Sequence, residues 1–264
     1  MGLMIDHIVI LGQDLDQAIA DYEALGFQVM PGGKHPRFTH NALVTFADSA
    51  YLELIAFHEM PDASGDDGTH RWVQYVAQGG GLIDFAVAAD DLDGLLAEMA
   101  ANDGSHRGPV PGARNRPDGV EIAWKMGQHR NDIPNTGHLP FLIQDVTPRE
   151  LRVPPEGATH ANGVRGVHSL VVAVTDLNAA VARYSAMVGS GPVDATIGVD
   201  DARTAAFDVG PHQVVLAEPT GAGVLRDEIA RKGEGPFELR LLAGENTVIE
   251  PGTASGARLR FITG

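Results

Sequence analysis

One pattern recurs along this chain: a short apolar strand followed by an Asp-Leu pair and a helix. The first copy runs from Ile5 to Leu11 and continues into Asp14-Leu15. Its residues are mostly apolar and several are β-branched, which is typical of a buried strand. Asp14 offers a helix N-cap, and apolar residues then follow at helical spacing until Gly26. This order predicts a strand and then a helix at the start of each copy.

Further strands follow the first helix and complete a β-α-β-β-β unit of about 55 residues. The same order repeats over 82–143 and over 167–216. Residues 236–264 contain strands but no helix, so the fourth unit is predicted to be truncated. One unit cannot cover its own sheet, and two must pair to bury it. The predicted fold is therefore α+β, with tandem βαβββ modules that form half-closed barrels.

A break in periodicity divides the chain. Residues 148–163 are rich in proline and glycine and show neither helical nor strand spacing, which predicts a linker. We expect a first domain of two modules over residues 1–147. A second domain over 164–264 would contain one full module and the truncated one. A chain of 264 residues is long enough for two such domains.

Charge and composition narrow the class of protein. The formal net charge of −16 argues against nucleic acid and anionic membranes as partners. The chain has no cysteine, which excludes disulfides, thiolate nucleophiles and zinc–thiolate sites. No apolar run approaches the roughly 20 residues of a membrane span, and the N-terminus has no signal-peptide pattern. We expect a soluble, cytoplasmic protein that binds a small molecule.

Three titratable residues fall on predicted core strands: His7, Glu53 and Asp84. One imidazole and two carboxylates can bind a divalent metal ion and leave positions for substrate oxygens. Without a metal, burial of Glu53 beside Asp84 would raise the pKa of one carboxyl, which suits a general base. The predicted metal ligands are therefore His7, Glu53 and Asp84, and the predicted catalytic residues are Glu53 and Asp84. The alternative is a core histidine and a solvent-facing Glu53.

Polar and aromatic residues near later strands are candidates for ligand binding. Several cluster around the second and third strands, where they would meet an anionic or carbonyl-bearing ligand, or else form a solvated loop. Arg114 and Arg116, in a Gly/Pro-rich hairpin, would contact the ligand at the rim of a pocket or else belong to a plain turn, and the tryptophan would be a core residue or part of the pocket wall. The predicted substrate-binding residues are His35, Arg37, His40, Asn41, Arg116 and Trp124.

The third unit differs from the first at its chemical positions. Ser169 stands where His7 stands, because each lies seven residues before an Asp-Leu pair. His168 is one residue out of register, and such a shift turns a strand side chain to the other face unless a bulge intervenes. Val215 stands at the position of Glu53. We expect the second half to support the structure, a homodimer contact or a lid, without a second catalytic site.

Six segments of the chain match a known pattern: Asp6-His7-Ile8-Val9, Gly33-Lys34-His35-Pro36, Thr39-His40-Asn41-Ala42-Leu43, Tyr51-Leu52-Glu53-Leu54-Ile55, Arg116-Pro117-Asp118-Gly119 with Trp124, and Leu139-Pro140-Phe141. Together with the repeated modules they resemble the vicinal oxygen chelate superfamily, and residues 5–145 resemble its glyoxalase-like domain group. The resemblance implies a cup lined by two units. In metal-using members a divalent ion is held by the first and last strands of each unit, which here correspond to His7, Glu53, Asp84 and Phe141. Members that bind metal tightly carry glutamate at the position of Phe141.

The resemblance implies an enzyme that acts on a small molecule with a carbonyl group or vicinal oxygens. The chemistry would be proton abstraction, lyase-type or hydrolytic, with a divalent metal ion as Lewis acid in the metal-dependent form. An alternative is a binding protein that sequesters a small molecule, as some drug-binding members do. A third hypothesis is an interaction module whose unpaired C-terminal strands pair with another protein or a second copy.

Overall fold

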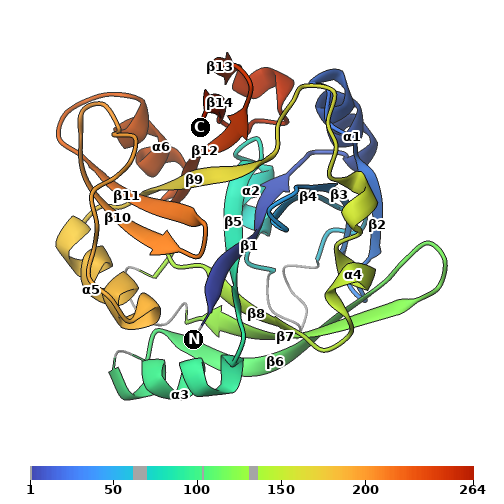
Figure 1. Ribbon diagram of the computed structural model, residues 1–264, viewed down its shortest axis with the longest axis horizontal. Helices are drawn as coiled ribbons and strands as arrows, with labels where there is room; N and C mark the ends of the chain where they lie inside the picture. Colours follow the sequence, from blue (N-terminus) through green and yellow to red (C-terminus); the bar gives the residue numbers. More distant parts are fainter. Residues whose placement is uncertain (1, 62–69, 103, 131–135) are drawn as a thin grey trace.

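The computed structural model describes residues 2–61, 70–102, 104–130 and 136–264. The described strands form two sheets, a closed eight-stranded barrel and a six-stranded sheet (Figure 1). The α+β class and the repeated modules predicted from the sequence are confirmed. In barrel order the strands are β1 (Leu3–Leu11), β4 (Tyr51–Phe57), β3 (Thr39–Thr45), β2 (Met30–Lys34), β6 (His106–Asn115), β7 (Glu121–His129), β8 (Phe141–Asp145) and β5 (Gly81–Ala89).

The Asp-Leu pairs begin helices as predicted. Asp14 caps the first helix by accepting a 3.0 Å hydrogen bond from the backbone N–H of Gln17. Asp91 and Asp176 accept equivalent bonds at the start of the second-module and third-module helices. Such caps satisfy backbone donors that a helix N-terminus leaves unpaired. The helices are α1 (Leu15–Ala24), α2 (Val73–Val76), α3 (Leu92–Asn102), α4 (Arg149–Arg152), α5 (Leu177–Val188) and α6 (Val224–Lys232), with short 3₁₀ turns η1 (Pro155–Gly157) and η2 (Pro251–Thr253). No helix in the described part of the chain is both long and apolar enough to span a membrane.

A pair of bulges relates the two barrel modules. β1 and β5 are antiparallel neighbours, and their register skips Asp6 on one strand and Ile83 on the other. His7 follows the first bulge and Asp84 follows the second, so the pseudo-two-fold axis that exchanges the modules also exchanges His7 and Asp84. This agrees with the sequence spacing, because Asp84 lies seven residues before Asp91-Leu92 just as His7 lies seven residues before Asp14-Leu15. A bulge turns the next side chain to a new face, which here is the barrel interior.

The last strand of each module follows the same symmetry. Val9 lies two residues after His7 and pairs with Glu53 of β4. Ala86 lies two residues after Asp84 and pairs with Phe141 of β8. Phe141 is therefore the counterpart of Glu53, and the second module carries an apolar ring where the first carries a carboxylate.

The second sheet stays open. Its strand order is β10 (Ala202–Val209), β11 (His212–Pro219), β9 (Gly166–Ala173), β12 (Gly235–Ala243), β14 (Leu259–Thr263) and β13 (Thr247–Ile249). Where the first module has β2, the third has one isolated bridge between Val193 and Ala206. No described α-helix separates β12 from β13, which confirms that the fourth module is truncated. Helix α6, which precedes β12, was not predicted from the sequence.

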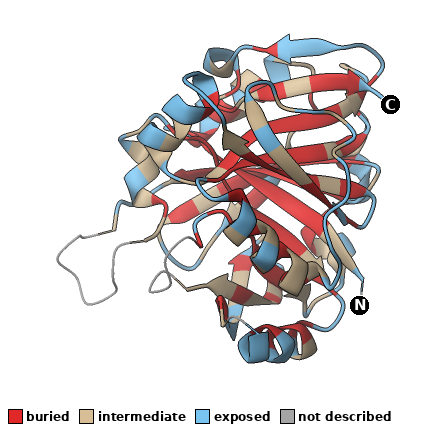
Figure 2. Ribbon diagram, turned by 90° about the vertical axis from the view of Figure 1, so that its left-hand side faces the viewer, coloured by how far each residue is buried: buried red, intermediate tan, exposed pale blue. Residues whose placement is uncertain are grey.

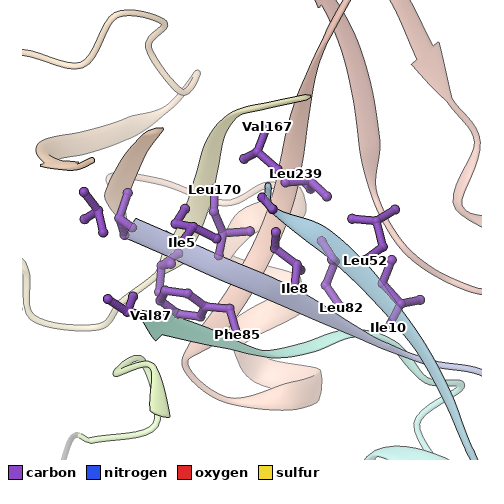
Figure 3. Close-up of a cluster of buried hydrophobic side chains, with 14 of the residues drawn as sticks. Ile5, Ile8, Ile10, Leu52, Leu82, Phe85, Val87, Val167, Leu170 and Leu239 are labelled. Atoms are coloured by element: carbon purple, nitrogen blue, oxygen red, sulfur yellow. The ribbon is translucent and has the colours of Figure 1, made fainter. Parts of the chain in front are cut away.

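The two sheets share one hydrophobic core. Outward-facing residues of β1 and β5, such as Ile8 and Phe85, pack against Leu170 and Leu239 of β9 and β12 (Figure 3). Buried residues therefore run along the strands where the sheets meet, and exposed residues lie mostly on the peripheral helices and loops (Figure 2). Because the convex faces pack together, the concave faces point away from each other. The barrel interior remains available for a site.

The segment predicted as a linker is packed against the barrel. It contains α4 and η1, and the side chain of Arg152 in α4 is 2% exposed. Arg152 donates to the buried carboxylate of Asp6 and to the hydroxyl of Tyr51. The connection between the two sheets therefore also closes one end of the barrel. The division into two domains stays a prediction, because both sheets contribute to the shared core.

Candidate functional site

The barrel encloses a cavity of about 480 Å³. Its walls come from both modules, with His7 on β1, Glu53 on β4 and Trp124 on β7 among the lining side chains. The volume falls within the range of small-molecule sites, which is roughly 300–1,000 Å³. The cup implied by the resemblance is therefore present, and it is formed by the first two modules.

His7 is held in one orientation. Its ring is 3% exposed, stacks on Tyr51 at 4.7 Å between centroids, and meets the edge of Phe141 at 5.2 Å. Its Nδ1 lies 2.6 Å from Oδ1 of Asp6. Nε2 then faces the carboxylate of Glu53, 3.6 Å from Oε2. A carboxylate behind an imidazole favours a proton on the near nitrogen and leaves the far nitrogen as an acceptor.

Asp6 is the buried charge that orients this histidine. Arg152 donates to both of its oxygens at 2.9 Å, and Arg149 donates a further bond to it. Burial alone would raise the pKa of Asp6, but the guanidinium of Arg152, with His7, holds it well below its ordinary value. Asp6 is therefore ionised at neutral pH and acts as a permanent acceptor for Nδ1 of His7.

Glu53 is the carboxylate at the centre of the cavity wall. It is 6% exposed, and Asn41 donates to its Oε1. His35 Nε2 lies 3.8 Å from the same oxygen, while His35 Nδ1 is fixed by Thr39 Oγ1 at 2.9 Å. Burial lowers the pKa of His35, and Glu53 opposes this shift only in part. Two oriented imidazoles thus flank one buried carboxylate.

Asp84 lies apart from this group. Its carboxylate accepts bonds from the Trp72 indole at 2.8 Å and from the backbone N–H of Phe85 at 2.9 Å, and it pairs with Arg71. It lines a neighbouring cavity of about 400 Å³. Burial raises the pKa of Asp84, and the charge of Arg71 offsets this only partly. The strand register therefore relates Asp84 to His7, but its side chain is held by other partners.

The predicted metal ligands do not fit a resident metal ion. Across 2–61, 70–102, 104–130 and 136–264, no group of three or more histidine, aspartate or glutamate side chains is arranged to hold one. The physical reason lies in the second module. Asp84 is already engaged by a cation and two N–H donors, and Phe141 has no ligand atom. Of the four positions, only His7 and Glu53 therefore bring a ligand atom to the described lining of the main cavity.

Four of the six predicted substrate-binding residues line the cavity: His35, Arg37, Asn41 and Trp124. His40 borders a separate depression beside α1 and β2. Arg116 pairs with Asp118 at 2.9 Å and donates to the carbonyl of Leu151 at 3.2 Å. The structure thus brings together the residues around Glu53 and leaves His40 and Arg116 outside the described lining.

Sequence reasoning missed most of the positive charge in the cavity. Among the residues that the structure describes, the lining contains four arginines and one carboxylate, that of Glu53, so the formal charge of this described lining is +3 in a chain whose net charge is −16. Arg114 lies on β6, whose prolines and glycines look like turn residues in the sequence. Arg71 precedes α2 and Arg152 ends α4, and neither segment shows a periodic pattern in the sequence. The four arginines are Arg37, Arg71, Arg114 and Arg152.

Comparisons with known proteins agree with this geometry. A family model described as a glyoxalase-like domain matches residues 5–188, which extends past the predicted linker into β9 and α5. A hypothetical protein from Staphylococcus aureus is similar over 100% of both chains, with 15% identity and a TM-score of 0.76. A mutant of 4-hydroxymandelate synthase from Streptomyces coelicolor is similar over 92% of this chain and 72% of its own, with 14% identity and a TM-score of 0.59.

At these identities the structural neighbours show the fold alone. No curated protein sequence matches the chain. The family match covers more than half of the chain, and it spans the residues that build the cavity. The chain therefore belongs to the glyoxalase-like domain family of the vicinal oxygen chelate superfamily.

Proposed function

We propose that this protein is an enzyme that moves a proton on a small carbonyl-bearing or vicinal-oxygen-bearing molecule bound in the barrel. The observation that carries the proposal is the environment of Glu53. Its buried carboxylate faces the cavity between two imidazoles, 3.6 Å from His7 Nε2 and 3.8 Å from His35 Nε2. A carboxylate in such a site has the geometry of a general base.

Each neighbour has a distinct role in this proposal. Glu53 takes the proton from the carbon next to the carbonyl, and Asn41 holds Oε1 so that Oε2 is the reacting oxygen. His7 accepts or returns a proton at Nε2, because Asp6 keeps Nδ1 protonated. His35 stays neutral at working pH because burial lowers its pKa. It donates or accepts a hydrogen bond without adding charge.

The arginines of the lining suit the charge that such a reaction develops. Loss of a proton next to a carbonyl puts negative charge on the carbonyl oxygen, and fixed donors aimed at that oxygen lower the barrier. Arg114 is 3% exposed and is held by the carbonyl oxygens of Gly32 and Arg152. Trp124 and Phe141 supply apolar walls. The site therefore favours a small, planar, anionic molecule.

We propose these steps without a metal ion, because the donor set does not fit one. Lyase or hydrolytic chemistry remains compatible with the same base. The test is proton exchange in D₂O, followed by NMR, on a panel of small 2-oxo and 2-hydroxy acids. We expect exchange with at least one compound, unchanged by EDTA. Glu53→Gln should slow it by about 100-fold or more, the usual contribution of a general base.

A matched control separates chemistry from folding. Glu121→Gln makes the same change on an exposed barrel residue and should leave exchange unchanged. A compound that stabilises the protein against heat but never exchanges would favour the sequestration hypothesis instead. Exchange that persists in Glu53→Gln, or that disappears with EDTA, would contradict the proposed mechanism.

A further inference from the structure

A guanidinium occupies the half of the site that belongs to the second module. Arg71 lies just before α2, and it borders both the main cavity and the neighbouring one. It pairs with Asp84, and its Cζ lies 5.2 Å from the centroid of the Phe141 ring. Asp84 and Phe141 are the symmetry counterparts of His7 and Glu53. Arg71 therefore brings a positive charge to the place opposite the predicted base.

The packing around Arg71 holds this charge in place. Trp72 stacks beside the guanidinium at 5.3 Å, and the Trp72 indole also donates to Asp84. The Nη1 atom of Arg71 lies 3.3 Å from Nδ1 of His129. Burial, with the charge of Arg71, lowers the pKa of His129 to about 3, so this ring is neutral and can accept the bond. Two apolar rings, an acid and an imidazole thus fix one arginine.

Within the part of the chain that the structure describes, the contacts of the Arg71 guanidinium leave some of its donors unused. An arginine carries five N–H groups in a rigid fork, and the contacts to Asp84 and His129 engage Nη2 and Nη1 once each. The Arg71 side chain is 25% exposed, and Arg71 lines both cavities. A planar ligand oxygen pair can therefore meet the remaining donors in the main cavity, which Glu53 also lines.

We propose that Arg71 is a built-in cation that binds an anionic oxygen of the ligand, in the role that a divalent ion has in metal-using relatives. The ligand class is a small molecule with two adjacent oxygens, at least one of them in a carboxylate. Guanidinium matches this group because it bonds two oxygens at once and stays charged at all working pH values. The inference rests on the proposed function only for the position of the reacting carbon, opposite Arg71 and beside Glu53.

The first test measures anion binding alone. Oxalate, which has two adjacent carboxylates and no exchangeable C–H, is titrated by calorimetry in the presence of EDTA. We expect Arg71→Ala to weaken oxalate binding by about tenfold or more, the scale of one lost charge-assisted bond. The oxalate affinity of Arg71→Lys should lie between those of the wild type and Arg71→Ala, because lysine keeps the charge but lacks the two-pronged donor geometry of arginine. Arg203→Ala, in an exposed pair with Glu218, should match the wild type.

The second test introduces a metal-binding site in place of the Arg71 guanidinium. Combining Arg71→Ala with Phe141→Glu frees Asp84 and completes a His7, Glu53, Asp84 and glutamate set. We expect Mn²⁺ affinity, measured by electron paramagnetic resonance, to rise by about tenfold or more over the wild type. Circular dichroism verifies that each variant is folded. Arg71→Lys keeps the oxalate test informative if Arg71→Ala does not fold.

Two results would overturn the inference. One is oxalate affinity in Arg71→Ala or Arg71→Lys equal to that of Arg203→Ala. The other is tight Mn²⁺ binding by the wild type that oxalate requires for its own binding. Neither result depends on whether Glu53 is the general base. If Glu53→Gln leaves proton exchange unchanged while Arg71→Ala weakens oxalate binding, the proposed function fails and the anion site stands. The reverse pattern removes only the role of Arg71.

Discussion

The barrel and the second sheet have bulges at matching strand positions, yet within the described residues the histidine and the carboxylate that line a cavity together lie in the barrel. β9 and β12 carry bulges at His168 and Phe237, in the same places as the bulges of β1 and β5. Ser169 and Glu238 are therefore the counterparts of His7 and Asp84. The predicted match between Ser169 and His7 is confirmed, and the bulge places His168 at the position of Asp6.

The concave faces of the two sheets differ in what covers them. In the second sheet, Leu225 and Ile229 of α6 pack onto Val171, Val215 and Phe237. In the barrel, β2 and β6 close the ring through the pairing of Lys34 with Asn115, so no helix is needed to cover that face. The comparison shows that a closed wall keeps a hollow open, whereas an open sheet buries its apolar face against a helix.

The buried acids of the two halves also differ. Glu238 forms ion pairs with Arg240 at 2.8 Å and with Arg260 at 3.3 Å, so its charge is neutralised locally. Glu53 has an amide donor and two imidazoles as neighbours. One acid is part of a structural ion group, and the other is available to a ligand. This difference, like that in packing, predicts how variants of each half should behave.

The largest effect is expected at the buried arginine that closes the barrel. Arg152→Ala leaves Asp6 buried without its main partner, and breaking such a pair costs about 3–5 kcal/mol. Arg240→Ala in the second sheet should cost less, because Arg240 donates one bond to Glu238, whereas Arg152 donates two to Asp6 and two to Asp145. Urea unfolding of both variants measures the difference. A larger loss in Arg240→Ala would contradict the comparison of the two ion groups.

A smaller effect is expected from truncating one apolar residue on each concave face. Leu225→Ala removes packing between α6 and the second sheet and should destabilise the protein by about 2–5 kcal/mol. Met126→Ala only enlarges a cavity that already exists, so we expect about 1 kcal/mol or less. Thermal and urea unfolding compare the pair. Equal losses would mean that the two faces are packed alike.

The smallest effect is expected from the ionisation of Asp6. It changes the free energy of unfolding only at acidic pH. The pKa of folded Asp6 lies well below its ordinary value of 3.8, because Arg152 and His7 outweigh burial. Its contribution to stability is therefore complete above that value and is lost as the pH falls toward the folded pKa. Unfolding free energies between about pH 5 and about pH 2 should fall more steeply in the wild type than in Asp6→Asn. Parallel curves would show that Asp6 does not titrate in this way.

Much of the fold could be predicted because its signals are local. The spacing between a strand residue and the next Asp-Leu pair gave the correct counterparts of His7 in the second and third modules. The absence of a helical pattern after β12 correctly indicated the truncated module. β6 was missed because its prolines and glycines look like turns, although they are accommodated in a strand that pairs along β7 and meets β2 at a single position. The polar segment of α6 was missed because it is short and mostly exposed.

The site could be predicted only in part. His7, His35, Asn41 and Glu53 lie together as expected, since strand alternation and module symmetry place them on one wall. Asp84 could not be assigned from symmetry alone. Its partners, Arg71 and Trp72, come from an irregular segment whose side chains show no periodicity. The proposed homodimer contact stays a prediction.

The sequence by itself determined the repeated modules, the helix starts and the strand residues that face inward, because each depends on neighbours a few positions away. The tertiary structure decided which charges meet. Asp6 meets Arg152 and Arg149, which lie more than 140 residues further along the chain, only when the barrel closes. The same closure pairs Lys34 of β2 with Asn115 of β6. Charge pairing acts through space and leaves no spacing rule in the chain, so the electrostatics of the cavity follow from the fold.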